Sequence, residues 1–129
     1  LMRQFDDVMG IVRDRSAQIV DARSAARFTA LEPEPRPGVR GGHMPGAANL
    51  PWRAVVRADG TLKSEDELHA IFADARDDLH APIVTTCGSG ISAAILMLAL
   101  QRVGAPKVAL YDGSWTEWGG RPEAPVERP

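Results

Sequence analysis

One cysteine stands in a setting that can make its sulfur reactive. Cys87 is the only cysteine of the chain, and Gly88-Ser89-Gly90 separates it from an apolar segment that begins at Ile91. Glycine has no Cβ, so such a loop can bend sharply and aim several backbone N–H groups at one atom. A helix starting after the loop adds unpaired N–H groups and the positive end of its dipole. We expect a sulfur held there to be a thiolate, which is the nucleophilic form.

An inert thiol is the alternative for the same residue. A cysteine at the end of a strand is often a small buried apolar side chain with no chemistry. The order strand, Cys87, glycine-rich loop and helix favours the reactive interpretation. A single cysteine excludes an internal disulfide framework and a multi-cysteine metal site. A lone cysteine also suits a reducing compartment, and we expect the cytoplasm. We expect neither a metal nor an organic cofactor.

Alternating helix and strand patterns flank this loop and must position it. Four helices are predicted, over residues 2–13, 64–76, 91–103 and 113–118. A capping box at Ser64 and Glu67 marks the start of the second, which runs to about Arg76, and Gly104 marks the end of the third. Strands are predicted at residues 18–21, 47–50, 83–86 and 107–111. Apolar strands separated by helices predict an α/β fold, in which helices cover both faces of a small parallel β-sheet.

Polar residues follow three of the predicted strands. They are Asp21-Ala22-Arg23, Cys87-Gly88-Ser89-Gly90 and Asp112-Gly113-Ser114. Ligands of parallel sheets bind beyond the carboxyl ends of the strands, so we predict a pocket there. The long stretch 29–45, rich in Pro, Glu, Gly and Arg, is typical of a functional loop.

Length and charge limit the class of protein. The chain has 129 residues, with 15 basic and 17 acidic side chains and a net charge of −2. We expect one domain over residues 1–129, with 119–129 as a surface tail. The balanced charge argues against nucleic acid and membrane-surface partners. The apolar stretch 91–100 is half a membrane span, and no secretory signal opens the chain. A start at Leu1 instead of methionine predicts a piece of a longer protein.

Four ordered motifs resemble one known family. The loop Cys87-Gly88-Ser89-Gly90-Ile91-Ser92 is similar to the active-site loop of the rhodanese superfamily, and within it to that of 3-mercaptopyruvate sulfurtransferases. Three further stretches match in family order, at residues 21–28, 42–51 and 111–118. The resemblance spans residues 19–118 and is closest to the C-terminal catalytic half of tandem-domain sulfurtransferases. It implies a rhodanese-like fold and a second, N-terminal rhodanese domain in the full-length chain.

The resemblance also implies a reaction. Cys87 would take sulfur from 3-mercaptopyruvate as a persulfide, release pyruvate, and pass the sulfur to cyanide or to an acceptor thiol, either a small thiol or a thioredoxin-like protein. Arg27 and Arg36 stand at the positions that bind the carboxylate. Ser89 would relay a proton, in the resembled enzymes together with an aspartate of the preceding domain. The remaining loop residues implied in the site are Gly88, Gly90, Ile91 and Ser92.

Other activities of this family are separated by single positions. Related phosphatases carry an arginine six positions after the cysteine, where this chain has Ala93. Rhodaneses that prefer thiosulfate carry Arg-Lys at Gly88-Ser89, and two cations suit a doubly charged anion. We therefore expect mercaptopyruvate as the donor. Thiosulfate sulfurtransferase activity is the nearest alternative, and a non-catalytic module that binds partners or carries a persulfide is another.

Several of these residues also have structural interpretations. Arg36 lies in a Pro/Glu segment, where charged side chains are usually solvated. Arg27 is suited to a salt bridge with Glu32 or Glu34, and the Gly-Ser-Gly around Ser89 is common turn chemistry.

Two further groups of residues are expected to be structural. We expect His43 to bond to a neighbouring backbone group instead of acting as a base. Arg23 is expected to pair with Asp21, and Trp115 and Trp118 to belong to the core.

Overall fold

One parallel sheet organises the molecule. The computed structural model describes residues 2–75, 78–89 and 91–128, and in these residues five strands pair in the order β1-β5-β4-β2-β3, each pair parallel. The strands are β1 Met2–Arg3, β2 Gln18–Asp21, β3 Ala48–Asn49, β4 Ile83–Thr86 and β5 Val108–Tyr111. The helices are α1 Phe5–Asp14, α2 Ala25–Phe28, the 3₁₀ turn η1 Trp52–Val55, α3 Glu65–Asp74, α4 Ile91–Arg102 and α5 Ser114–Trp118.

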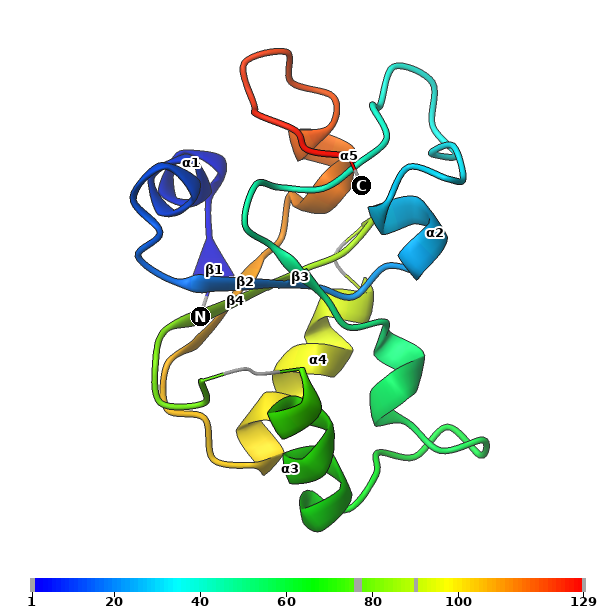
Figure 1. Cartoon of the computed structure of the whole chain (residues 1–129), viewed down its shortest axis with the longest axis vertical. Coiled ribbons are helices and arrows are strands. Elements are labelled where there is room, and N and C mark those ends of the chain that lie inside the picture. The colour runs from blue at the N-terminus through cyan, green and yellow to red at the C-terminus, as the bar shows by residue number, and fades with distance from the viewer. Residues whose placement is uncertain (1, 76–77, 90, 129) are drawn as a thin grey trace.

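Helices cover the two faces of the sheet, which confirms the predicted α/β architecture (Figure 1). On one face α3, α4 and η1 pack on alternate residues of β2 and β4, including Val20 and Ile83. On the other face α1 and α5 pack on Ile19 and Val84. Because neighbouring residues of these strands belong to opposite cores, the pairs Ile19-Val20 and Ile83-Val84 are apolar on both faces, as expected for a sheet buried on both sides.

The register of the two central strands fixes the position of the loops. β2 pairs with β4 from Gln18 opposite Ile83 to Asp21 opposite Thr86. Both strands therefore end at the same level, and the segments that follow Asp21 and Thr86 start side by side. The predicted meeting of polar junctions at the carboxyl edge follows from this register.

Most predicted elements are confirmed with small shifts of their bounds. Ser64 caps α3 through a capping box, since its hydroxyl accepts from the Glu67 N–H at 3.2 Å while Glu67 Oε1 accepts from the Ser64 N–H at 3.1 Å. Gly104 follows α4 with φ +82°, a conformation that side chains rarely adopt. The short elements α2 and η1 were not predicted, because four residues give too little periodicity to detect.

The helix predicted over residues 2–13 was wrong at its beginning. Met2 and Arg3 form β1, which extends the sheet beside Leu110 and Tyr111 of β5. The helix begins only at Phe5, where the Gln4 N–H donates to Asp7 Oδ2 at 2.9 Å. Helical spacing of apolar residues does not reveal an open sheet edge, which is a tertiary feature.

The tail 119–129 was predicted to lie on the surface, and for part of its length this was wrong. Ala124 is 1% exposed, the indole of Trp118 donates to Pro125 O at 2.8 Å, and His43 and Glu127 form an antiparallel bridge. Arg40 holds the tail from the long loop, because its guanidinium donates to backbone carbonyls of Trp118, Gly119, Arg121 and Ala124 at 2.6–3.2 Å. A Pro- and Gly-rich composition hid this buried contact.

Replacing Arg40 by alanine is predicted to destabilise the fold. The substitution leaves four carbonyl groups without their charged donor, and we expect the free energy of unfolding to fall by about 2–4 kcal/mol. Urea unfolding followed by tryptophan fluorescence measures the loss. Arg128→Ala is the matched control, since Arg128 lies exposed in the same tail. Equal stability of the two variants would contradict a stabilising role for the Arg40 hydrogen bonds.

Candidate active site

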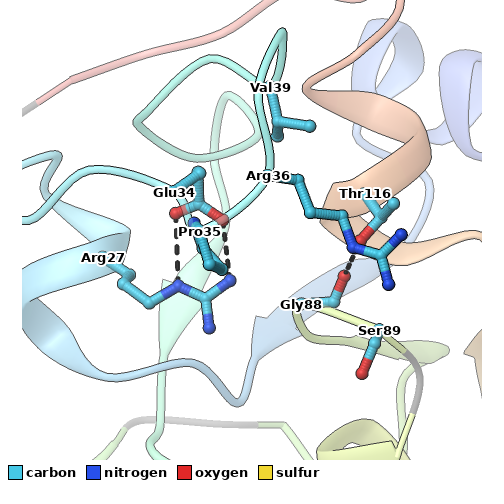
Figure 2. Close-up of a pocket in the computed structure, with 8 residues that line it drawn as sticks. All are labelled: Arg27, Glu34, Pro35, Arg36, Val39, Gly88, Ser89 and Thr116. Atoms are coloured by element: carbon cyan, nitrogen blue, oxygen red, sulfur yellow. Dashed lines mark hydrogen bonds and ion pairs between the residues drawn. The ribbon is translucent and has the colours of Figure 1, made fainter.

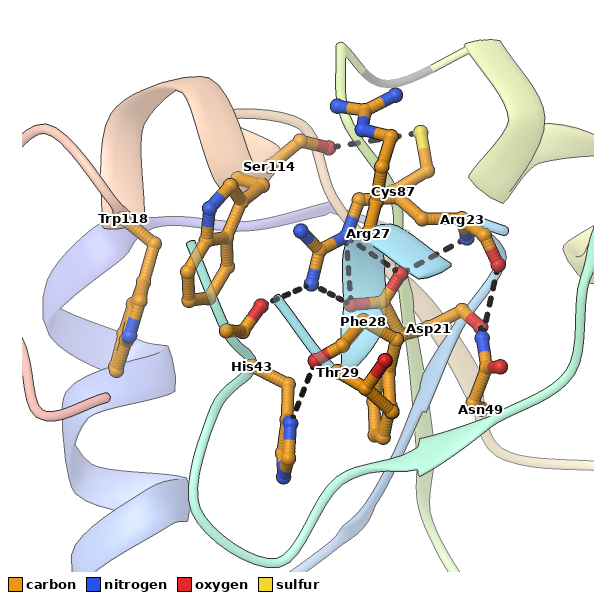
Figure 3. Close-up of polar contacts among 12 residues, drawn as sticks. Asp21, Arg23, Arg27, Phe28, Thr29, His43, Asn49, Cys87, Ser114 and Trp118 are labelled. Atoms are coloured by element: carbon orange, nitrogen blue, oxygen red, sulfur yellow. Dashed lines mark hydrogen bonds and ion pairs between the residues drawn. The ribbon is translucent and has the colours of Figure 1, made fainter. Parts of the chain in front are cut away.

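Cys87 directly follows β4 and lies under the loop that begins there. The residue is 1% exposed and packs in the core between the sheet and α4. Its Sγ lies 3.9 Å from the hydroxyl oxygen of Ser114 (Figure 3). The thiol is thus shielded from bulk water, while the following residues Gly88 and Ser89 reach the surface of a pocket.

The start of α5 fixes the peptide groups of this loop. Cys87 O accepts from Trp115 N at 2.7 Å, and Gly88 O accepts from Thr116 N at 3.0 Å and from Thr116 Oγ1 at 2.7 Å. A trans peptide holds its C=O and the next N–H in opposite directions. The N–H groups of Gly88 and Ser89 therefore point away from α5. This is the arrangement that an anion-binding loop requires.

A pocket of about 220 Å³ opens beside the loop (Figure 2). Figure 2 shows its basic side chains coming from the segment 27–36, with Gly88 and Ser89 on the other side. The lining residues are Arg27, Glu34, Pro35, Arg36, Val39, Gly88, Ser89 and Thr116. The structure thus brings together the predicted residues Arg27, Arg36, Gly88 and Ser89 in one pocket.

Hydrogen bonds hold both the backbone and the side chain of Arg27. Its backbone N–H donates to the hydroxyl of Ser24, the N-cap of α2, at 3.3 Å. Its side chain is paired with Glu34, which accepts from Nε at 3.2 Å and from Nη2 at 2.7 Å. This hydrogen bond raises the pKa of Arg27 above its ordinary value. Of the two predicted partners, Glu32 and Glu34, the structure selects Glu34.

The absence of a side chain at Gly88 leaves room for the guanidinium of Arg27. A Cβ at position 88 would lie 2.8 Å from Arg27 Nη2 and 3.3 Å from Nη1. Any side chain at Gly88 would therefore displace Arg27 from its present position. The charged end of Arg27 lies directly against the residue that follows Cys87.

A chain of buried charges supports Arg27. Arg23 donates to both carboxylate oxygens of Asp21 (Figure 3). It also reaches Glu34 at 3.3 Å. The side chains of Arg23 and Asp21 are each 1% exposed and that of Glu34 is 3% exposed. Arg23 also lies 4.4 Å above the Trp115 ring. The predicted pair of Arg23 with Asp21 is confirmed, and it extends through Glu34 to the pocket.

The other predicted site residues lie in different surroundings. Arg36 is exposed and makes no hydrogen bond or ion pair within the part of the chain that the structure describes. Ile91 is 75% exposed at the start of α4, and Ser92 is half-buried in the same turn. Gly90 lies outside the described residues. Arg36 therefore contributes an uncompensated positive charge to the pocket.

Two residues near the cysteine were not assigned a role from the sequence. Ser114 is fully buried with φ +55°, and its hydroxyl donates to Tyr111 O at 3.0 Å beside Cys87. Burial and a 2.6 Å hydrogen bond to Glu117 raise the pKa of Tyr111, so its phenol stays protonated. Thr116 is the second of the two unassigned residues, because its N–H and its hydroxyl both donate to Gly88 O. Both lie in the 111–118 motif, so their position in a matched stretch was the available signal.

The structural interpretations of other residues are confirmed. His43 Nδ1 lies 2.8 Å from Phe28 O, and its ring stacks on Phe28 at 4.0 Å. Trp115 and Trp118 are fully buried.

Across residues 2–75, 78–89 and 91–128, no three His, Cys, Asp or Glu side chains are grouped so as to hold a metal ion. The same ranges contain no helix long and apolar enough to cross a membrane.

A comparison with protein families identifies the class of the domain. Residues 5–121 match the model of the rhodanese-like domain, and the sheet order and loop geometry agree with the predicted rhodanese-like fold. The chain therefore belongs to the rhodanese family.

Individual members of the family show which kinds of enzyme the chain is similar to. The chain is 52% identical to 3-mercaptopyruvate sulfurtransferase of Escherichia coli K12 over 94% of its own length and 43% of the relative. It is 40% identical to the thiosulfate sulfurtransferase of Cricetulus griseus over 92% of its length and 40% of the relative. The crystal structure of SseA from Escherichia coli, a 3-mercaptopyruvate sulfotransferase, superposes with a TM-score of 0.75 at 46% identity over 88% of this chain and 42% of that chain. The chain thus spans less than half the length of these relatives.

Substitution of Gly88 by alanine is predicted to displace Arg27 without unfolding the protein. The added methyl group meets the end of a flexible side chain, so we expect the Arg27 Nε–H NMR signal to lose its hydrogen-bonded shift while stability changes by less than about 1 kcal/mol. Ser89→Ala in the same loop is the control and should leave the signal in place. An unchanged Arg27 signal in Gly88→Ala would contradict the contact.

Proposed function

We propose that the domain is the catalytic half of a sulfurtransferase that takes sulfur from 3-mercaptopyruvate onto Cys87 and releases pyruvate. It corresponds in this proposal to the C-terminal half of a tandem-rhodanese protein, with 1–129 as a single domain. The observation that carries the proposal is the position of the Arg27 guanidinium against Gly88 in a pocket shared with Arg36 and Ser89. A carboxylate bound there lies next to the cysteine loop.

Binding of the donor uses the arginine pair. Mercaptopyruvate presents a planar carboxylate and an adjacent ketone, and a guanidinium binds a carboxylate through two parallel N–H···O bonds. Arg27 uses its Nε and Nη2 atoms for Glu34, so its outer Nη edge is left for the substrate. Arg36, without an ion-pair partner among the described residues, closes on the same carboxylate. The sulfur end of the donor then extends over Gly88 toward Cys87.

Sulfur transfer is a nucleophilic displacement at the donor sulfur. The Cys87 thiolate forms an S–S bond, the carbon–sulfur bond breaks, and its electron pair leaves with the pyruvate enolate. The proton of the donor thiol passes to the enolate carbon and leaves a persulfide anion, with the Ser89 hydroxyl as the relay. The N–H groups of the loop stabilise this anion. An acceptor thiolate or cyanide then removes the outer sulfur and restores the Cys87 thiolate.

Burial of Cys87 suits this covalent intermediate. With 1% of the residue exposed, Cys87 is shielded from the open surface, and the donor would approach it past Gly88 and Ser89, which line the pocket. Exclusion of water protects a persulfide from side reactions and strengthens the electrostatic contacts of the loop. A cytoplasmic location, a small thiol or a thioredoxin-like protein as acceptor, and a preceding rhodanese domain belong to the same proposal.

Conversion of Cys87 to serine is predicted to abolish the covalent step. Incubation of the full-length protein with mercaptopyruvate should add the mass of one sulfur atom to the peptide that contains Cys87, and Cys87→Ser should show no addition there. Peptide mapping by mass spectrometry measures it. Ser16→Ala, at an exposed position between α1 and β2, serves as the folded control. Absence of the adduct in the unaltered protein would favour a non-catalytic binding module.

The donor preference is a separate prediction. Thiosulfate is the second candidate, because a relative named thiosulfate sulfurtransferase is 40% identical to this chain. We expect kcat/KM to be at least about tenfold higher for mercaptopyruvate, since Gly88-Ser89 adds no cation for the second charge of thiosulfate. Steady-state kinetics with both donors and cyanide as the acceptor measure the ratio. A ratio that favours thiosulfate would replace the proposed donor.

A further inference from the structure

The carboxylate of Glu34 stands in a place where an anion-binding pocket would not be expected to hold one. It lines the pocket together with Arg27 and Arg36, yet its side chain is 3% exposed and ion-paired on both sides, to Arg27 at 2.7 Å and to Arg23 at 3.3 Å. A buried charge costs desolvation energy that only close, well-oriented partners offset. Glu34 therefore fixes its partners in one arrangement.

The geometry restricts the guanidinium of Arg27 to one binding edge. An arginine guanidinium carries five N–H groups, and two of its edges present a parallel pair: Nε with one Nη, and the two Nη atoms together. Glu34 occupies the edge formed by Nε and Nη2. Gly88 lies close to both Nη atoms, since a Cβ at position 88 would be 2.8 Å from Nη2 and 3.3 Å from Nη1. A donor carboxylate must use the remaining Nη edge, so Glu34 sets the angle at which the donor enters relative to Cys87.

The same carboxylate sets the charge of the pocket. Asp21, Arg23, Glu34 and Arg27 form a connected chain of two acids and two bases, and this chain has no net charge. Arg36 then supplies the uncompensated charge among the lining residues that the structure describes. One net positive charge matches a donor with one carboxylate, while a donor with two negative charges leaves one of them unbalanced.

We propose that Glu34 is a positioning and charge-balancing residue that makes the pocket select singly charged carboxylate donors over doubly charged ones. This inference rests on the proposed function of the same site and names its determinant of donor charge. Glu34 acts through Arg27 and does not touch the reacting sulfur. Its buried ion pair with Arg23 keeps the carboxylate in place when the donor arrives.

The test compares mercaptopyruvate and thiosulfate in the full-length protein and its variants. Glu34→Gln removes the charge at constant size, and we expect the ratio of kcat/KM for thiosulfate over mercaptopyruvate to rise about tenfold at low salt and to rise less at high salt. Glu34→Asp keeps the charge but retracts the carboxylate, so it should raise KM for both donors and leave the ratio within about twofold of the unaltered protein. Glu32→Gln removes an equal charge from an exposed position in the same loop, and it should change neither KM nor the ratio of kcat/KM for the two donors.

A fourth variant keeps the test decisive if Glu34→Gln does not fold. Pro35→Lys adds a cation at an exposed position of the pocket wall and leaves the ion pairs of Glu34 in place. It should move the donor ratio toward thiosulfate, as Glu34→Gln does. An unchanged ratio in Pro35→Lys, or equal ratios in Glu34→Gln and Glu34→Asp, would overturn the charge selection. Unaltered protein that takes sulfur from neither donor would instead overturn the proposed function.

Discussion

Hydrogen bonds between the start of α5 and the cysteine loop are the interaction on which the site depends. They fix the carbonyl groups of Cys87 and Gly88 toward Trp115 and Thr116, and planarity of the peptide then turns the next N–H groups the other way. Two of the three bonds are donated by backbone N–H groups, and the third by the Thr116 hydroxyl. Because β5 leads directly into α5, the pairing of β4 with β5 brings the two ends together. The position of the loop is thus a consequence of the sheet.

The charged side of the pocket is built by a different principle. Asp21, Arg23 and Glu34 are almost fully buried, and such groups contribute little net stability because desolvation offsets most of their attraction. What they supply is orientation, since removing one partner leaves another buried charge without compensation. Arg27 is 25% exposed at the end of this chain of charges. A rigid ion-pair chain therefore carries a side chain that faces solvent, and the loop 29–45 is anchored to the sheet through Glu34.

The sequence allows prediction of elements whose signals are local. The capping box at Ser64, the β-branched run of β4 and the glycine after α4 each indicate a boundary through their own chemistry, and the structure has them there. The pairing of Arg23 with Asp21 could be predicted for the same reason, as the residues are two apart. β1 and the burial of Ala124 could not, because each depends on a partner from the other end of the chain.

The same distinction applies to the candidate site. Residue types and spacing were sufficient to propose Cys87, whereas Arg27 and Arg36 were proposed from the resemblance to the rhodanese superfamily. The buried state of Cys87 and the double ion pair of Glu34 depend on packing over the sheet. From the sequence, Glu34 is one of two acids suited to a salt bridge with Arg27, and no local signal indicates that it also contacts Arg23. Its contact with two arginines follows only from the fold, which brings the long loop back over the end of β2, and this contact decides how much positive charge the pocket retains for a ligand.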